Sequence, residues 1–229
     1  MPDISQLEQA LGVTFLNKDT LRQALVHRSY LNEHPDFPLG HNERLEFLGD
    51  AVVELVVTEF LYHNYENPEG DLTNWRASLV NADMMAGICE TYGVDDFMLL
   101  SRGESKDAKS KARRYILANA FEAIIGAIYI DRGWEESKQF ILRSVISKLP
   151  EILEHRLYID PKSRFQEAAQ EHVGVTPSYR VLSEEGPDHA KKFQVGIYLE
   201  KDLIAVGTGM SKQEAQVAAA AEAVKVKGW

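Results

Sequence analysis

The stretch from His41 to Tyr62 is the most apolar segment of the chain, and acidic residues interrupt it at regular steps. Its apolar side chains recur every three or four residues, which predicts a long helix with one side in a hydrophobic core. Glu43, Glu46 and Asp50 are spaced by three and four residues, so they share one face of this helix. The fold therefore has to bury a helix that carries carboxylates beside its core.

Carboxylates stacked on one helix face repel one another, and an unpaired ionised carboxylate beside an apolar core is destabilising. A hard divalent cation such as Mg²⁺ offsets this cost, because it binds carboxylate oxygens and keeps some of its waters. A solvated acidic helix face is the alternative, and most acidic runs are of this kind. The valine, leucine and phenylalanine residues between the acids favour the metal site.

A second apolar stretch runs from Ile116 to Asp131 and also reads as a buried helix. Asn119 and Glu122 stand three residues apart in it, so their side-chain oxygens lie on one face. Two buried helices that each offer oxygen ligands on one side can close a metal site between them. The two stretches together therefore predict a cation site between the helices, with oxygen ligands from the row Glu43, Glu46 and Asp50 on one and from Asn119 and Glu122 on the other.

Composition limits the class of protein. The chain has 229 residues, which suits one large domain or two small ones. The single cysteine, Cys89, excludes an internal disulfide, and the first residues lack the basic and apolar regions of a signal peptide. No apolar run is long enough to span a membrane. We expect a soluble, cytoplasmic protein with no membrane partner.

The net charge of −10 argues against indiscriminate nucleic-acid binding, but the charge is unevenly distributed. Residues 160–229 hold nine basic and ten acidic side chains, so this part is close to neutral. The acidic excess therefore lies in the same part of the chain as the predicted cation site.

Residues 1–155 are predicted to form an all-helical domain, with a boundary marked by Pro150 and the polar stretch that follows. The expected helices are a short one ending at Gly12, one from Leu21 running into Tyr30, the long helix ending near Asn64, residues 75–80, 83–92 and 116–131, and one from Trp134 to Leu149. Loops are expected at 32–40 and at 101–107, and Asp71 or Thr73 is expected to cap the helix after the turn at 67–71.

Residues 160–229 are predicted to form a small α+β domain with the order α-β-β-β-α. Phe193, Val195, Ile197 and Leu199 alternate with more polar residues, which is typical of a half-buried strand. The other expected elements are a helix over 161–172, strands over 178–182 and 203–207, a hairpin turn at Lys201-Asp202, and a last helix capped by Ser211 that runs through Lys225.

The segment Asn42–Asp50, with the sequence NERLEFLGD, resembles the signature of the ribonuclease III family. In that resemblance the stretch 116–131 is the second catalytic motif. It implies a homodimeric endoribonuclease that needs Mg²⁺, with Mn²⁺ able to substitute, and that cuts double-stranded RNA in rRNA and mRNA precursors. The expected products carry 5′-phosphate and 3′-hydroxyl ends with short 3′ overhangs. Asp50 and Glu122 are the expected catalytic residues, and Glu46, Asn119 and Glu122 the expected metal ligands.

Residues 209–216, with the sequence GMSKQEAQ, stand at the start of the last helix and resemble the double-stranded-RNA-binding domain. Such modules recognise the A-form shape of RNA through 2′-hydroxyls and phosphates, not through the base sequence. The expected contacts are Gln166 and Glu167 in one minor groove, His189 in the next, and Lys212 and Gln213 at phosphates, near the positive end of the helix dipole.

The sequence departs from the family pattern at two places that bear on function. Asn119 stands where aspartate is usual, and its carbonyl oxygen can still bind Mg²⁺ or a metal-bound water, although with less charge. This departure leaves open an alternative, a catalytically impaired protein that binds double-stranded RNA without cutting it. Gln213 stands where a second lysine is frequent, which predicts weaker phosphate binding.

Five other residues of the first part of the chain have other expected roles. The resemblance suggests a role for Glu43 in dimer contacts or in supporting the site, and a role for Glu69 in substrate handling, while an ordinary surface role fits Glu43 equally well. Phe47 is expected to pack across a two-fold interface. His27 and His41 are expected to be structural, because magnesium prefers oxygen ligands.

Overall fold

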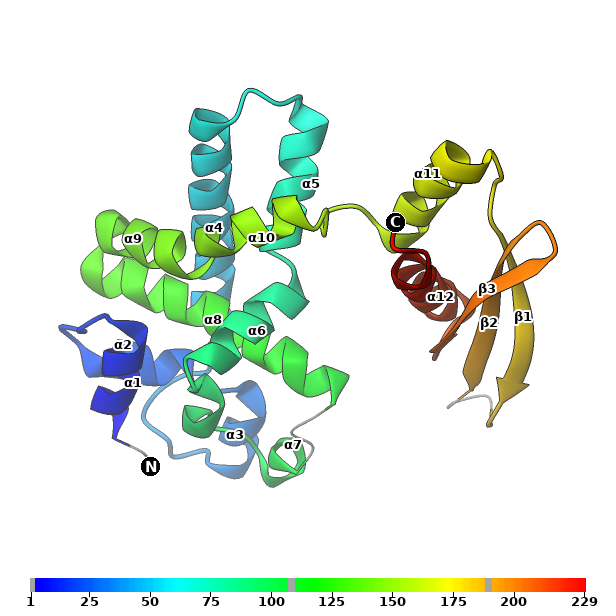
Figure 1. Cartoon of the computed structure of the whole chain (residues 1–229). Helices are drawn as coiled ribbons and strands as arrows, with labels where there is room; N and C mark the ends of the chain where they lie inside the picture. Colours follow the sequence, from blue (N-terminus) through cyan, green and yellow to red (C-terminus); the bar gives the residue numbers. More distant parts are fainter. Residues whose placement is uncertain (1–2, 107–109, 188–190) are drawn as a thin grey trace. The chain divides into compact units, whose positions relative to one another are not determined.

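The chain folds into two compact units, Met1–Tyr158 and Ile159–Trp229, each with its own hydrophobic core. The computed structural model describes residues 3–106, 110–187 and 191–229. Helices make up the first unit, and the second consists of a three-stranded sheet with two helices (Figure 1). The predicted fold class, an all-α domain followed by an α-β-β-β-α domain, is confirmed.

The first unit is built around two helices of equal length, α4 and α8, which cross near its middle (Figure 1). Both helices hold fully buried residues, among them Val53, Val56, Phe121 and Ile124. The elements are α1 Ile4–Leu11, α2 Lys18–Ala24, α3 Arg28–Glu33, α4 Glu43–Asn64, α5 Glu69–Leu79, α6 Ala82–Thr91, the 3-10 helix Val94–Phe97, α7 Arg102–Ser105, α8 Lys111–Arg132, α9 Trp134–Ser144, the 3-10 helix Ile146–Lys148 and α10 Leu149–Glu154.

The prediction of one helix from Leu21 into Tyr30 is wrong, because the chain leaves the helix after Ala24 and α3 begins only at Arg28. Between them Val26 forms an isolated parallel bridge with Leu99. The backbone N–H of His27 donates to the carbonyl of Leu99 at 3.0 Å. Tertiary pairing with a distant segment here overrides the local helical pattern, and α3 then takes up the first part of the expected loop 32–40.

Two helix starts also differ from the prediction. Helix α5 begins at Glu69, directly after Pro68, so neither Asp71 nor Thr73 caps it. Proline fixes the backbone just before the first turn, and the acidic residues of that turn lie near the positive end of the helix dipole. The expected loop at 101–107 contains a single helical turn, α7. Ser101 caps this turn, because its hydroxyl accepts a hydrogen bond from the backbone N–H of Glu104.

The expected helix from Trp134 to Leu149 is interrupted. Helix α9 ends at Ser144, whose hydroxyl donates to the carbonyl of Phe140 at 2.6 Å, a contact that weakens the regular backbone ladder. A 3-10 turn leads into α10, and Pro150 lies in the first turn of that helix, where a missing N–H costs nothing. Pro150 therefore starts a helix and does not end the unit.

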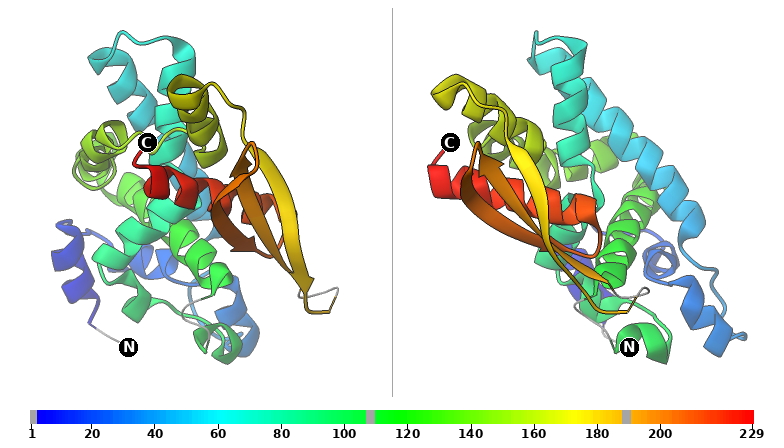
Figure 2. Two further views of the ribbon diagram at one scale, coloured as in Figure 1. Left: turned by 45° about the vertical axis from the view of Figure 1, so that its right-hand side comes forward. Right: turned by 90° about the vertical axis from the view of Figure 1, so that its right-hand side faces the viewer.

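In the second unit α11 Pro161–Val173 and α12 Lys212–Lys227 cover one face of an antiparallel sheet in the order β1-β2-β3 (Figure 2). The strands are β1 Ser178–Glu185, β2 Lys192–Leu199 and β3 Asp202–Gly209. Val195, Ile197 and Leu199 are buried, as the alternation predicts. The hairpin turn lies one residue earlier than expected, because Leu199 pairs with Asp202 and Glu200 adopts a positive φ of 52°.

No helix in the described part of the chain combines the length and the hydrophobicity that crossing a membrane requires.

Candidate active site and nucleic-acid interface

Two glycines allow α4 and α8 to touch through their backbones. A Cβ atom at Gly49 would lie 1.7 Å from the carbonyl oxygen of Glu122, and one at Gly126 would lie 2.1 Å from the carbonyl oxygen of Leu45. Any side chain at either position would force the helices apart. The close crossing brings the acidic face of α4 to the face of α8 that carries Asn119 and Glu122.

Glu122 experiences the strongest electrostatic effect at this crossing. Burial of the carboxyl, followed by the negative charges of Asp50, Glu46 and Glu54, raises its pKa to about 7. The order of these causes means that partial removal from water is the main effect and like-charge repulsion adds to it. The predicted residues Glu46, Asp50 and Glu122 are therefore close enough to interact.

Glu46 is the second strained carboxylate and the direct neighbour of Asn119. Burial raises the pKa of Glu46, and the charges of Glu43 and Asp50 add to the effect. A side-chain hydrogen bond with Asn119 acts in the opposite direction and favours the ionised form of Glu46. The Asn119 amide thus stabilises the negative charge of Glu46, because its NH₂ group can donate a hydrogen bond to the carboxylate. An ionised aspartate at position 119 could not donate and would add to the repulsion among the carboxylates.

The donor set fits a hard divalent cation. Among the residues that the structure describes, no lysine or arginine forms an ion pair with Glu46, Asp50 or Glu122, whereas Glu43, Glu54 and Glu59 on the same helix all have cationic partners. Carboxylate and amide oxygens are the ligands that Mg²⁺ prefers. Within the same described residues no three Asp, Glu, His or Cys side chains already converge tightly enough to hold an ion.

Two further charged residues border this face, and neither is among the residues predicted from the sequence. Glu54 lies four residues after Asp50 on α4 and contributes to the raised pKa of Glu122. Arg76 on α5 binds Glu54 at 3.2 Å and also donates to the hydroxyl of Thr58. The signal for Glu54 was present in the sequence, because it continues the acidic row by one helical turn. The pairing with Arg76 is tertiary and left no such signal.

Glu43, His41 and His27 lie around the site. Glu43 pairs with Arg28 at 3.4 Å and lies 3.7 Å from Nδ1 of His41. His27 accepts the first free N–H of α3, from Ser29, and burial lowers its pKa. His27 therefore caps α3, whereas Nδ1 of His41 is buried and has no hydrogen-bond partner among the described residues.

Phe47 lies on the side of α4 that faces away from the core, and its side chain is 80% exposed. Leu55 and Tyr62 continue the same side, each about two helical turns after the previous residue, and are 57% and 73% exposed. Glu69 lies further along, in a hollow of about 430 Å³ between α4 and α5 that Tyr62 and Arg76 also line. Large exposed apolar side chains in a row mark an interaction surface.

The nucleic-acid residues predicted from the sequence lie on two helices of the second unit. Gln166 and Glu167 are exposed on the first half of α11, next to the buried Phe165. Lys212 and Gln213 are exposed in the first turn of α12, whose cap is Ser211. His189 lies outside the described residues.

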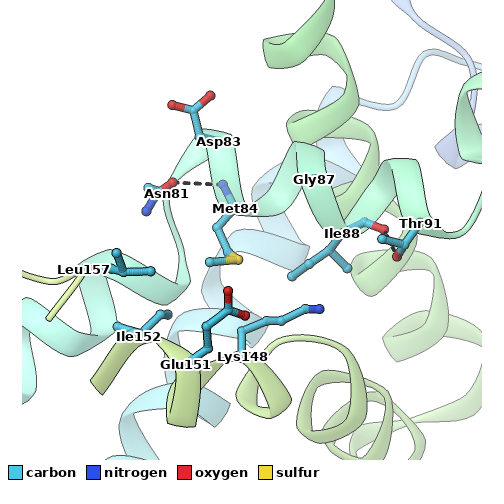
Figure 3. A pocket seen from close by; sticks show the side chains of 10 residues that line it. All are labelled: Asn81, Asp83, Met84, Gly87, Ile88, Thr91, Lys148, Glu151, Ile152 and Leu157. Atoms are coloured by element: carbon cyan, nitrogen blue, oxygen red, sulfur yellow. Dashed lines mark hydrogen bonds between the residues drawn. The ribbon is translucent and has the colours of Figure 1, made fainter. Parts of the chain in front are cut away.

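A second hollow of the first unit also lies away from the carboxylates. It is a cleft of about 400 Å³ between α6 and α10, in which Met84, Ile88 and Ile152 face one another and Lys148 and Glu151 stand at the rim (Figure 3). None of the predicted site residues lines it.

Comparisons with known proteins cover both units. Residues 17–149 match the family described as Ribonuclease-III-like, and residues 161–227 match the Double-stranded RNA binding motif. Ribonuclease 3 of Dehalococcoides mccartyi is 38% identical over 98% of this chain and 95% of its own length. Ribonuclease 3 of Campylobacter jejuni is 40% identical over 100% of this chain and 99% of its own.

A solved structure supports the same assignment for the first unit. The nuclease domain of the Campylobacter jejuni enzyme aligns with a TM-score of 0.57 at 40% identity, over 65% of this chain and 99% of that domain. Its description concerns flexibility in a region involved in dimer formation. On sequence, fold and domain order together, this chain belongs to the ribonuclease III family and is an endoribonuclease with a double-stranded RNA binding motif.

Proposed function

We propose that this protein is a Mg²⁺-dependent endoribonuclease that cuts double-stranded RNA and that its chemistry takes place at Glu46, Asp50, Asn119 and Glu122. The observation that carries the proposal is the cluster of carboxylates at the crossing of α4 and α8, which have no lysine or arginine partner among the described residues. A cluster held in this state is destabilising for the free protein, and a bound cation removes the cost.

Glu46, Asn119 and Glu122 would hold the ion, and Asp50 would act beside it. When bound, Mg²⁺ supplies Lewis-acid chemistry that activates water for in-line attack on a phosphodiester and stabilises the charge on the leaving 3′ oxygen. Mn²⁺ fits the same oxygen ligands. With a pKa of about 7, Glu122 carries a proton for part of the time at neutral pH and releases it when a cation binds.

The second unit would supply the affinity for duplex RNA. Gln166 and Glu167 on α11 can exchange hydrogen bonds with 2′-hydroxyls in a minor groove, and Lys212 can contact phosphates from the start of α12. We expect His189 to reach the next minor groove. The two parts of the chain would thus divide recognition and cleavage, with residues 1–155 as the catalytic and dimerisation domain and 160–229 as the binding domain.

A homodimer would cover the exposed stripe of Phe47, Leu55 and Tyr62 on α4. In an isologous dimer both subunits use the same patch, so the stripe of one subunit can be covered by the identical stripe of the other. The relative from Campylobacter jejuni is described as forming dimers through its nuclease domain, which supports the same arrangement here. Two sites in one dimer would cut both strands and leave short 3′ overhangs.

Precursors of rRNA and mRNA are the substrates we expect, in the cytoplasm. The impaired alternative rests on Asn119 alone, and the three retained carboxylates count against it. The direct test incubates the protein with a long duplex RNA, with Mg²⁺ and with EDTA. Short products with 5′-phosphates, formed only with Mg²⁺, support the proposal. A gel shift with intact RNA in Mg²⁺ would favour the non-cutting alternative.

A further inference from the structure

Lys212, which the proposed function assigns to RNA phosphates, already has an anionic partner within its own unit. Its ammonium group lies 3.0 Å from a carboxylate oxygen of Glu184 on β1. The same carboxylate lies 3.6 Å from the ammonium group of Lys191, which precedes β2. One acidic side chain therefore meets basic side chains from two separate elements.

The pair is well defined although it lies at the surface. The ammonium group of Lys212 also lies 5.6 Å from the centre of the Phe193 ring, and Phe193 is the residue that pairs with Glu184 across the strands. The side chains of Lys212 and Glu184 are 57% and 36% exposed, so both can be reached from solvent. The hydrogen bond from Lys212, followed by the nearby charge of Lys191, lowers the pKa of Glu184, which keeps this carboxylate ionised at neutral pH.

We propose that Glu184 limits the affinity of this protein for duplex RNA, because its carboxylate competes with a backbone phosphate for the ammonium group of Lys212. This inference rests on the proposed phosphate contact of Lys212. A phosphate oxygen that binds this group comes within a few ångströms of the Glu184 carboxylate, and two anions at that distance repel. An exposed ion pair is weak, so a phosphate can displace Glu184, but the negative charge remains beside the interface.

The two lysines make this arrangement specific. Lys212 begins α12 and Lys191 leads into β2, so Glu184 links the start of the last helix to the start of the second strand. When an RNA phosphate binds Lys212, Glu184 loses its contact with Lys212 but keeps the one with Lys191. Position 213 is glutamine and not a second lysine, so Lys212 supplies the positive charge of this helix turn. Its ion pair with Glu184 should therefore have a large effect on phosphate binding.

The test measures duplex binding by the full chain in EDTA, so that the RNA stays intact, over a range of salt concentrations. Glu184→Gln keeps the size of the side chain and removes its charge. We expect it to tighten binding about three- to ten-fold at low salt and to steepen the dependence on salt by about one released counterion.

Glu185→Gln is the matched control. It removes the same charge from the next residue of β1, whose side chain makes no ion pair among the described residues. We expect it to bind within about two-fold of the unaltered protein. Lys212→Gln should weaken binding, and Glu184→Gln added to Lys212→Gln should give a smaller gain than it gives alone.

Equal affinities of the Glu184→Gln and Glu185→Gln variants, or weaker binding by Glu184→Gln, would overturn the competition and leave the proposed function intact. If the unaltered protein shows no salt-dependent binding to duplex RNA, the phosphate contact and the competition fall together. Thermal unfolding of each variant establishes that the second unit is folded in every measurement.

Discussion

The carboxyl group of Glu122 should make the metal-free protein less stable as pH rises. Its pKa is about 7 in the folded protein, against about 4.5 in the unfolded chain. The folded state therefore holds this proton more tightly, and stability is full below pH 4.5 and decreases as pH rises through 7. In EDTA, Glu122→Gln should be more stable than the unaltered protein at pH 8, by about 1–2 kcal/mol after allowing for solvent screening.

The difference should disappear near pH 4.5, where Glu122 is protonated and resembles glutamine. Urea unfolding of both proteins in EDTA at pH 4.5 and pH 8 measures it. Addition of Mg²⁺ at pH 8 should stabilise only the unaltered protein to a large extent. A constant difference between the two proteins at both pH values would contradict the raised pKa.

Sequence and structure each add a different fact about the role of Asn119 at the candidate site. The sequence identifies it as a departure from the usual aspartate, and the structure adds that its amide is hydrogen-bonded to Glu46. Asn119→Asp replaces a donor by a fourth negative charge. We expect the substitution to lower the Mg²⁺ concentration needed for half-maximal cleavage, and to lower stability in EDTA by about 1 kcal/mol.

A Mg²⁺ titration of cleavage with both forms on one duplex, together with urea unfolding in EDTA, checks this prediction. Superimposable titration curves would show that residue 119 does not act on the metal. Cleavage that appears only in the aspartate form would instead mean that Asn119 inactivates the protein.

At the scale of the helices, the contact between α4 and α8 depends on the absence of two side chains. In Gly49→Ala the new Cβ would lie 1.7 Å from the carbonyl oxygen of Glu122, a backbone atom that cannot rotate away. The helices would have to separate, which we expect to lower the free energy of unfolding by about 3 kcal/mol or more. Displacement of the carboxylates should also reduce cleavage.

Gly87→Ala is the control for helix propensity. Gly87 lies within α6, and a Cβ atom there would meet nothing within 4 Å. Alanine should therefore be neutral or stabilising by up to about 1 kcal/mol. Chemical unfolding of the two variants measures the contrast, and a similar effect of both substitutions would mean that the crossing tolerates a side chain.

The helical period of the sequence predicted α4, α8 and α12 well, because each has a continuous buried side that repeats at helical steps. It failed where partners from elsewhere decide the outcome. Val26 leaves the helix because it bridges to Leu99, 73 positions along the chain, and no local pattern encodes that contact. Pro150 was expected to end a helix, but proline is also favoured in the first turn of a helix, which is where it lies in α10.

The candidate site was predictable in part for the same reason. Glu46, Asp50 and Glu122 stand out because charged residues recur within apolar helices. The sequence also contains Gly49 and Gly126, yet only the close approach of the two backbones shows that each glycine is required by the other helix. The competition of Glu184 for Lys212 depends on strand pairing and on the position of α12, so it could not be read from the spacing of residues.

At the scale of the whole molecule, the two units should separate recognition from cleavage. A chain that ends after Tyr158 keeps the complete core of the first unit and the exposed stripe on α4. We expect it to form dimers and to bind duplex RNA weakly at physiological salt, because the phosphate contacts of the second unit are missing. Analytical ultracentrifugation and filter binding measure both properties. Duplex binding as tight as that of the full chain would contradict this division.

The most direct measurement compares cleavage and binding of one duplex RNA by the full chain and by Asp50→Asn and Glu122→Gln. Both substitutions remove a negative charge from the crossing of α4 and α8 and leave the second unit unchanged. Our account predicts that Mg²⁺-dependent cleavage falls by at least about a thousand-fold, while the dissociation constant for the duplex in EDTA changes by less than about three-fold. Mg²⁺-dependent cleavage at the unaltered rate in both variants would contradict the assignment of the chemistry to these carboxylates.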